Sequence, residues 1–212
     1  MLEQLWTSKF KSISPVDIKS TVGSYNQSFA GTIQQDSQEF LSSMLDWLQM
    51  EVNRVAKPSP MPEQIVVDKG DVSAAKSHWI NYMERNQSIK LFCGQTHSVI
   101  KCFICDGESV NYSHFTLLTL PLPEHTNKTS VRECLELYLK EDSLSDYKCE
   151  FCKRSGKVTK KTDIVKLPAL LIIHLNRFRH DGTKKENFVH FDLRNVNIGQ
   201  YAVPGFENRN NR

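Results

Sequence analysis

The chain has 212 residues, of which 39% are hydrophobic and 24% are charged, and its formal net charge is +3 at pH 7. A chain of this length can bury a sizeable core, so we expect one globular domain, or one domain with a projecting subdomain. Acidic and basic residues are interspersed without a dense Lys/Arg run, and no apolar run approaches membrane-spanning length. These features argue against nucleic-acid partners and membrane insertion.

Two helices are predicted in the first quarter of the chain. Ser14-Pro15-Val16-Asp17 has the form of a helix start, with Ser14 as N-cap and Pro15 at the first helical position, and the helix is expected to end near Val22. Asp36-Ser37-Gln38-Glu39 has the form of a capping box that opens a longer helix. Its apolar residues recur at three- and four-residue steps: Phe40, Leu41, Met44, Leu45, Leu48, Val52 and Val55.

The next segment is predicted to be a loop followed by a further helix. Residues 57–70 contain three prolines and a Lys-Gly pair without periodicity, which favours a loop or linker. Asp71 then caps a helix with Ala75, His78, Trp79, Tyr82 and Met83 on one side. We interpret His78 as a core or interface residue.

From residue 91 the pattern changes to strands, which makes the fold class α+β. Residues 91–101, 109–120 and 164–178 are rich in Val, Ile, Leu, Phe and Thr. The apolar run at 169–175 predicts a strand covered on both sides, in which His174 is expected to be a hydrogen-bonded core residue and not a catalytic base. Ser130 and Glu133 form a second capping box before a helix with one apolar face: Val131, Cys134, Leu135, Tyr138 and Leu139.

Two cysteine pairs of equal spacing stand out, Cys102 with Cys105 and Cys149 with Cys152. A two-residue spacer lets both thiolates of a pair bind one ion, and two pairs complete a tetrahedral zinc shell. A closed four-sulfur shell leaves no position for substrate, so this zinc is expected to be structural. Buried free cysteines or two disulfides remain the alternatives. Glycines 107 and 156 are expected to supply the permissive backbone of the metal-binding turns.

Three strings of this sequence resemble the ubiquitin-specific protease family, a class of papain-like cysteine deubiquitinases. The strings are Gln34-Gln35-Asp36-Ser37-Gln38-Glu39-Phe40; Leu91-Phe92-Cys93-Gly94-Gln95; and Tyr147-Lys148-Cys149-Glu150-Phe151-Cys152 together with residues 167–178. The likeness runs from about residue 5 to residue 201 and is closest to the endosome-associated branch.

The resemblance implies a hand-shaped domain, of which this chain holds the central part. Residues 1–90 would be late thumb helices, 91–163 zinc-stapled fingers, 164–206 part of the palm sheet, and 207–212 a disordered tail. The family reaction is hydrolysis of the isopeptide bond after the last glycine of ubiquitin. The implied partners are ubiquitin and ubiquitinated proteins. Zinc-binding thiolates favour a reducing compartment, so the expected location is cytoplasmic or nuclear, and the resemblance adds endosomes as a further possibility.

The resemblance also implies contacts to the arginine-containing carboxyl-terminal tail of ubiquitin. Asp36, Gln38 and Glu39 match the family string that lines the tail channel, and Phe178 matches an aromatic residue beside it. Carboxylates suit a basic tail. The structural alternatives are that Asp36 and Glu39 only cap their helix, and that Phe178 packs in the core.

The family's Asn-Thr-Cys and Gly-His-Tyr strings, which carry its nucleophile and its base, are absent from this sequence. We therefore assign no catalytic residue, and we reject Cys93 as a substitute nucleophile because it lies at a variable position on a predicted strand. The chain is expected to be a fragment of an enzyme. The alternative is a ubiquitin-binding protein that has lost its chemistry. A third hypothesis, which the mild net charge weakens, is an unrelated zinc-ribbon adaptor or nucleic-acid binder.

Overall fold

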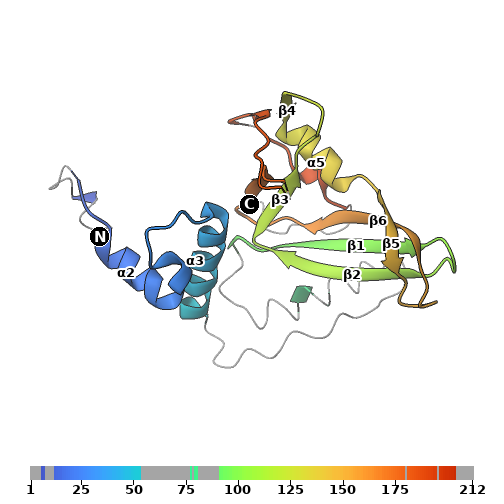
Figure 1. The fold of residues 1–212 in the computed structure, drawn as a ribbon, viewed down its shortest axis with the longest axis horizontal. Coiled ribbons are helices and arrows are strands. Elements are labelled where there is room, and N and C mark those ends of the chain that lie inside the picture. The colour runs from blue at the N-terminus through green and yellow to red at the C-terminus, as the bar shows by residue number, and fades with distance from the viewer. Residues whose placement is uncertain are drawn as a thin grey trace. The chain divides into compact units, whose positions relative to one another are not determined.

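The computed structural model describes residues 6–7, 12–53, 77, 79–80, 91–179, 181–194 and 196–203 (Figure 1). The chain divides into two compact units, Met1–Val52 and Asn53–Arg212. Helices form the described part of the first unit, while strands together with helix α5 form most of the described part of the second, as expected for an α+β chain. No helix within the described ranges is both long and apolar enough to cross a membrane.

Helix α2, Val16–Tyr25, starts and ends later than predicted. Pro15 is the N-cap and no side chain caps the helix, so the prediction of Ser14 as N-cap is wrong. Pro15 has a non-helical ψ of 35°, and its carbonyl accepts the hydrogen bond from Lys19 N at 2.9 Å. The first turn therefore begins one residue further along than the proline rule suggests. The helix continues to Tyr25, beyond the predicted end at Val22.

An aromatic cluster connects the helices of the first unit. The short 3-10 helix η1, Gln27–Phe29, places the buried Phe29 against Phe40 and Trp47 of helix α3, with ring centroids at 5.4 and 6.4 Å and both pairs edge to face. Tyr25 of α2 also lies 5.2 Å from Trp47. Such pairs favour edge contacts because the ring edge is positive and the face negative.

Helix α3 spans Ser37–Val52 and confirms the predicted long helix. Its start is capped by Asp36, whose Oδ1 accepts the N–H of Gln38 at 2.7 Å and whose carbonyl accepts the N–H of Phe40 at 3.0 Å. The predicted apolar face is only partly covered within this unit, since Leu48 is 54% exposed and Val52 is 60% exposed. Val55, the loop at 57–70 and most of the helix after Asp71 lie outside the described residues.

The second unit is built around a four-stranded antiparallel sheet in the order β2-β1-β6-β5 (Figure 1). Strand β1 (Gly94–Cys102) and strand β6 (Ser155–Lys166) form its centre, and β2 (Glu108–Phe115) and β5 (Asp142–Lys148) form its edges. The sequence did not predict β5, whose residues are nearly all exposed and polar. It also missed most of β6, residues 155–163.

Two of the predicted strands are each divided between two sheets. Residues 109–120 form nearly all of β2 and then most of strand β3, Leu117–Pro121. Residues 164–178 form the end of β6 and then strand β7, Ile172–Asn176, after a break at Pro168. Strands β3 and β7 pair in parallel as a separate two-stranded sheet. The chain thus leaves one sheet for another where its composition still indicates a continuous strand.

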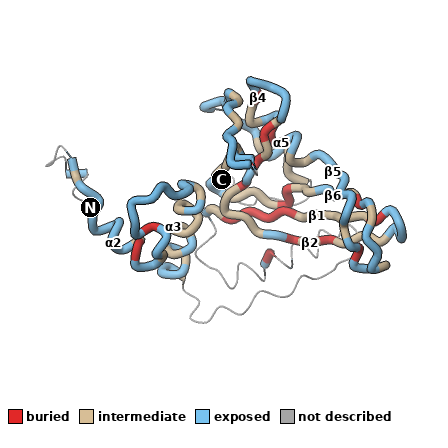
Figure 2. Tube along the Cα trace, viewed as in Figure 1, coloured by how far each residue is buried: buried red, intermediate tan, exposed pale blue. Residues whose placement is uncertain are grey.

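The main core of the second unit lies where β3, β6 and helix α5 (Val131–Leu139) meet. Ser130 and Glu133 make the predicted capping box, and Cys134 is fully buried, as expected for a packed apolar residue. Buried segments are visible along β1 and in α5 (Figure 2). The fully or nearly fully buried members of this core are Leu118, Leu120, Leu122, Cys134, Leu135 and Ile164.

Strand β7 is less covered than predicted. Its residues from Ile172 to Leu175 are half-buried, so the described part of the chain does not cover the strand on both sides. His174 is correspondingly half-buried and not a core residue; its Nδ1 lies 3.3 Å from Oγ1 of Thr119, its neighbour on β3. The predicted hydrogen bond is present. Nearby, the short strands β4 (Lys128–Ser130) and β8 (Phe188–His190) pair in parallel, and the 3-10 helix η3 spans Gly199–Tyr201.

Candidate functional site

The two cysteine pairs lie at one end of the four-stranded sheet, each in the turn between neighbouring antiparallel strands. Cys102 ends β1 and Cys105 precedes β2, while Cys149 follows β5 and Cys152 precedes β6. We call these turns the first knuckle, residues 102–107, and the second knuckle, residues 149–154. The central strands bring them together, because Cys102 pairs with Val158 and the N–H of Phe103 donates to the carbonyl of Lys157 at 3.2 Å.

The knuckles share one backbone design. The N–H of Cys102 donates to the carbonyl of Gly107 at 2.9 Å, and the N–H of Cys149 donates to the carbonyl of Arg154 at 3.0 Å. In both, the residue after the second cysteine is left-handed: φ is 54° at Asp106 and 59° at Lys153. The interpretation of the knuckle glycines as permissive backbone is therefore wrong, because neither has a positive φ.

Gly107 and Gly156 are needed for close packing instead. A Cβ on Gly107 would lie 2.7 Å from Cδ2 of Phe151, and a Cβ on Gly156 would lie 2.6 Å from Cδ1 of Ile104. Each glycine thus makes room for an apolar side chain of the opposite knuckle. The sequence signal for this arrangement is the apolar residue directly before the second cysteine of each pair, Ile104 and Phe151.

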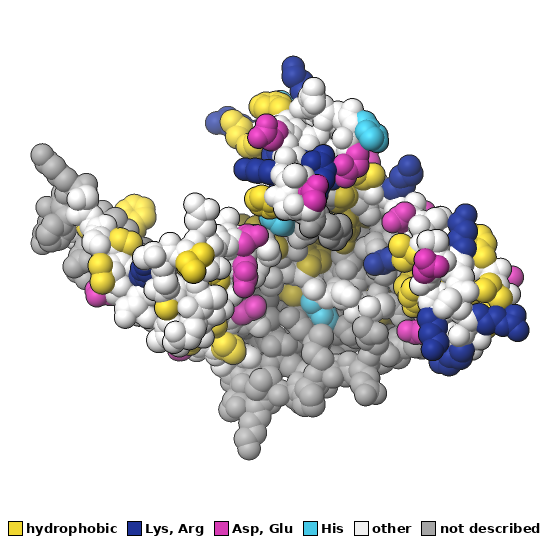
Figure 3. All heavy atoms as spheres, viewed as in Figure 1, with side chains coloured by type: hydrophobic (Ala, Val, Ile, Leu, Met, Phe, Trp, Pro, Cys, Tyr) yellow, Lys and Arg dark blue, Asp and Glu magenta, His cyan; other side chains and the backbone are white. Residues whose placement is uncertain are grey.

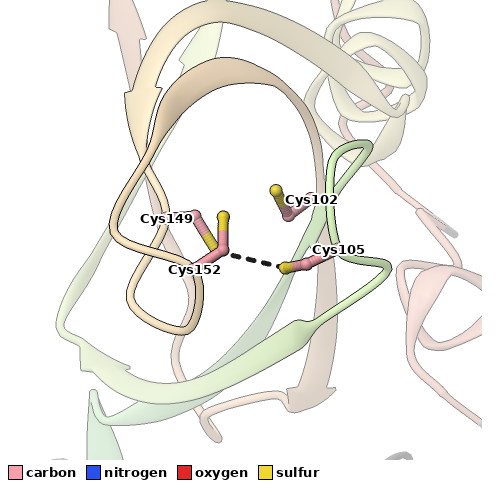
Figure 4. Close-up of side chains that lie close together, drawn as sticks. All are labelled: Cys102, Cys105, Cys149 and Cys152. Atoms are coloured by element: carbon pink, nitrogen blue, oxygen red, sulfur yellow. Dashed lines mark hydrogen bonds between the residues drawn. The ribbon is translucent and has the colours of Figure 1, made fainter.

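The four sulfur atoms are grouped as a metal site requires (Figure 4). All four Sγ atoms lie within 4.8 Å of one another, and the Sγ atoms of Cys105 and Cys149 are 3.7 Å apart. A tetrahedral ion with sulfur at about 2.3 Å separates its ligands by about 3.8 Å, so the observed grouping fits. The four cysteines are free thiols, so the disulfide alternative is not what the structure shows.

Backbone amides already stabilise negative charge on the buried sulfurs. The N–H of Ile104 donates to Sγ of Cys102 and the N–H of Phe151 donates to Sγ of Cys149, both at 3.4 Å. In the metal-free cluster, hydrogen bonds from the backbone of Cys152 and then of Phe151 lower the pKa of Cys149 to about 7. The N–H of Gly107 has the same effect on Cys105, but desolvation and the neighbouring thiols outweigh it and raise that pKa to about 11.

The two remaining cysteines are not arranged as nucleophiles. Cys93 is 1% exposed, directly precedes β1, and its thiol donates to the carbonyl of Gly94 at 3.6 Å. Cys134 is fully buried in helix α5, and burial raises its pKa. A nucleophilic thiol has to be accessible and readily ionised. The rejection of Cys93 therefore stands on its burial.

Acidic side chains lie on the surface of the first unit (Figure 3). Asp36 and Glu39 are exposed, while Gln38 is half-buried and donates through Nε2 to Oγ of Ser42 at 3.1 Å. Asp36 caps helix α3 through Oδ1, as the structural alternative predicted. A capping carboxylate still has lone pairs on its second oxygen, so capping does not exclude a further contact.

Phe178 lies on a hairpin of the second unit and is 59% exposed, so it does not pack in the core there. It bridges to Lys184 across the hairpin, whose turn contains Gly182 at a φ of 80°. Arg177 fixes the base of this hairpin, because its Nη1 donates to the carbonyls of Lys185 at 3.1 Å and Asn187 at 2.9 Å.

Comparison with known proteins identifies the family. A family model described as ubiquitin carboxyl-terminal hydrolase matches residues 1–212. The chain is 35% identical over 212 residues to ubiquitin carboxyl-terminal hydrolase 2 of Gallus gallus. The aligned region covers 95% of this chain and 59% of that protein. The chain is also 31% identical over 218 residues to ubiquitin carboxyl-terminal hydrolase 21 of Bos taurus, and that aligned region covers 91% of this chain and 39% of that protein.

Solved structures agree with these matches. The SAGA Ubp8/Sgf11/Sus1/Sgf73 DUB module bound to ubiquitin aldehyde matches 84% of this chain and 35% of its own chain, with a TM-score of 0.55 and 24% identity. The same module bound to monoubiquitin matches 88% of this chain and 38% of its own, with a TM-score of 0.55 and 25% identity. The chain thus has the fold of a ubiquitin-specific protease catalytic domain, and it belongs to the ubiquitin carboxyl-terminal hydrolase family.

Proposed function

We propose that this chain is the ubiquitin-recognising part of a thiol-dependent deubiquitinase, which hydrolyses the isopeptide bond after the last glycine of ubiquitin on ubiquitinated proteins. The observation that carries the proposal is the family match, which extends over residues 1–212. The relatives are ubiquitin carboxyl-terminal hydrolases by name, and the similar DUB modules are bound to ubiquitin aldehyde and monoubiquitin. The chain spans about 39% to 59% of those relatives, so the activity is proposed for the protein as a whole.

We propose that the four-cysteine cluster binds one structural Zn²⁺ ion. Four thiolates from two Cys-x-x-Cys turns are a typical zinc set, and the sulfur separations suit a tetrahedral ion. Bound zinc would connect the β1–β2 turn to the β5–β6 turn. It would have no open coordination position, so its contribution is to the stability of the sheet end that we propose forms the ubiquitin-binding fingers.

Recognition of the ubiquitin tail is proposed to involve Asp36, Glu39 and Phe178. Asp36 and Glu39 offer exposed carboxylates, which form charge-assisted hydrogen bonds with arginine. Phe178 offers an exposed ring on a hairpin that Arg177 holds in place. Gln38 is expected to contribute less, because its amide already donates to Ser42.

The experiment is an NMR titration of isotope-labelled ubiquitin with the zinc-loaded chain. Resonances of the ubiquitin tail should shift, and Asp36→Asn should reduce those shifts while keeping the helix cap, since Asn is also a strong N-cap. Asp36→Lys should reduce them further, because it places like charge beside the tail arginines.

The matched control is Asp46→Asn, which removes an exposed carboxylate from the same helix. It should leave the ubiquitin shifts unchanged. An unperturbed ubiquitin spectrum with a folded, zinc-loaded chain would contradict ubiquitin binding by this chain. Equal effects of Asp36→Asn and Asp46→Asn would instead contradict only the role of Asp36.

A further inference from the structure

The four sulfurs of the cluster differ in their exposure to solvent. Cys102 and Cys149 are each 3% exposed and pack with Val158, Ile100 and Tyr147. Cys152 is half-buried, whereas Cys105 lies in the outer part of the first knuckle and is exposed. A reagent from solvent therefore reaches the cluster most directly at Cys105.

The exposed sulfur lies next to a buried sulfur of the other knuckle. Sγ of Cys105 is 3.7 Å from Sγ of Cys149, and the close-up shows the two side chains approaching from separate turns (Figure 4). A disulfide bond is about 2.0 Å long, so a closing movement of about 1.7 Å joins these atoms. Its exposure thus identifies Cys105 as the sulfur that meets an oxidant first, and its proximity identifies Cys149 as the partner for a disulfide.

We propose that Cys105 is a reversible oxidation site for hydroperoxides and that its oxidation ends in a disulfide with Cys149. The proposal rests on the structural zinc site proposed above. It assigns to the cluster a second chemistry, in which the two turns that zinc connects become covalently linked and the ion is released.

Two balanced steps lead to the disulfide. The Cys105 thiolate attacks one oxygen of the hydroperoxide, the O–O bond breaks, and the sulfur is oxidised by two electrons to a sulfenic acid while hydroxide or alkoxide leaves. The Cys149 thiolate then attacks the sulfur of that sulfenic acid, the S–S bond forms, and hydroxide leaves. A dithiol reductant reverses the change by thiol exchange.

The loss of two ligands decides what happens to zinc. After disulfide formation only Cys102 and Cys152 still offer thiolates, which is half of a closed structural shell. Zinc release therefore accompanies oxidation, with one ion released for each cross-knuckle disulfide.

The test begins with a measurement of zinc in the purified, reduced chain, followed by treatment with limiting hydrogen peroxide. A chromophoric chelator reports released zinc, and mass spectrometry of alkylated, non-reduced peptides identifies the disulfide. We expect zinc release to match the yield of the Cys105–Cys149 disulfide, and a dithiol to restore zinc binding. With a sulfenic-acid trapping reagent present, the first label should appear on Cys105.

Two equally exposed aromatic residues provide matched variants. Phe151 is 51% exposed, and both its ring and Sγ of Cys105 lie close to Gly107. Phe103 is 55% exposed, and Nζ of Lys157 lies 5.6 Å from the centroid of its ring. Phe151→Ala should expose Cys105 further and speed peroxide-dependent zinc release several-fold, while Phe103→Ala should not. Release measured without peroxide corrects for any loss of zinc affinity in either variant.

The outcomes separate the two proposals. A reduced, folded chain without zinc overturns the metal site and this inference with it. A zinc-loaded chain that first forms a disulfide within either Cys-x-x-Cys pair, or first traps a label at another cysteine, overturns the oxidation site and leaves the metal site intact.

Discussion

Gly107 ends the first knuckle and Gly156 lies just beyond the second, and a methyl group at each would meet a different obstacle. At Gly107 the added Cβ would lie 2.7 and 3.1 Å from two ring atoms near the root of the Phe151 side chain, and 3.2 Å from Sγ of Cys105. At Gly156 it would lie 2.6 Å from the terminal methyl of Ile104. A terminal methyl can move by a rotamer change, whereas the ring cannot move without its whole side chain.

This difference predicts unequal costs for two similar substitutions. Gly107→Ala should destabilise the cluster by about 1–3 kcal/mol, as overpacking commonly does, and should weaken zinc binding because it displaces Cys105 or Phe151. Gly156→Ala should change zinc affinity much less. Competition with a chelator of known affinity measures both, and equal losses in the two variants would contradict the packing role assigned to Phe151.

At this scale the sequence predicted the cluster but not how its turns are made. The spacing of the four cysteines was sufficient, because a two-residue spacer has few ways to present two sulfurs to one ion. The left-handed residues were not predictable from side-chain preference, since Asp106 and Lys153 adopt a conformation that glycine favours more. The backbone hydrogen bonds of each knuckle impose that conformation.

The capping box at the start of helix α5 is expected to contribute measurably to the stability of the chain. Ser130 Oγ accepts the N–H of Glu133 at 3.2 Å, and Oε2 of Glu133 accepts the N–H of Ser130 at 2.8 Å. Ser130→Ala should cost about 1 kcal/mol, because it leaves a helix amide without its acceptor. Urea unfolding measures this cost, and Ser143→Ala, which changes an exposed serine of edge strand β5, is the control.

The same box predicts a pH dependence. Hydrogen bonds from Oγ1 of Thr129 and from the N–H of Ser130 lower the pKa of Glu133 below its ordinary value of 4.5. A lowered folded-state pKa adds stability above pH 4.5 that is lost as the pH falls through the folded-state value. Glu133→Gln keeps an acceptor but does not titrate, so the stability advantage of the parent protein should shrink as the pH falls in that window. An unchanged difference between pH 7 and pH 4 would contradict the assignment.

Helices were easier to predict than strands for a physical reason. Caps such as Asp36 and Ser130 are local signals that survive in the folded chain. Strand composition, by contrast, says nothing about which neighbour a strand pairs with, so the passages from β2 to β3 and from β6 to β7 were not visible. Strand β5 escaped prediction because its exposed edge position leaves it polar.

At the scale of the molecule, metal removal should loosen the whole end of the sheet. The double variant Cys102→Ser/Cys149→Ser should lose most of its zinc and become sensitive to protease near the knuckles, because metal binding contributes directly to folding. Cys93→Ser is the matched control, since a serine there can still donate to the carbonyl of Gly94. Elemental analysis and limited proteolysis measure the effect, and stoichiometric zinc in the double variant would refute the site.

Acid should have the same result in the unmodified chain. Zinc requires deprotonated sulfurs, and in the metal-free cluster the pKa is about 7 for Cys149 and about 11 for Cys105. Zinc binding at neutral pH must therefore displace protons, so the apparent affinity should fall as the pH falls. A zinc titration in weak buffer with an indicator dye should show proton release. Binding without proton release would contradict thiolate ligation.

The 212-residue chain by itself is expected to have no deubiquitinase activity. Acyl transfer at neutral pH needs an ionised nucleophile within hydrogen-bond reach of a base. Of the six cysteines, four form the cluster, which includes no histidine of the described residues that could act as a base, and Cys93 and Cys134 are buried. His174 is hydrogen-bonded to Thr119. His190 is the last residue of β8, and its Nε2 lies 3.5 Å from Oδ1 of Asp192.

We therefore expect no turnover of a ubiquitin–fluorophore amide by the 212-residue chain, and no adduct with a ubiquitin probe that carries a carboxyl-terminal electrophile. A covalent adduct mapped to Cys93 or Cys134 would overturn this expectation, because it would require that buried thiol to become accessible beside a base.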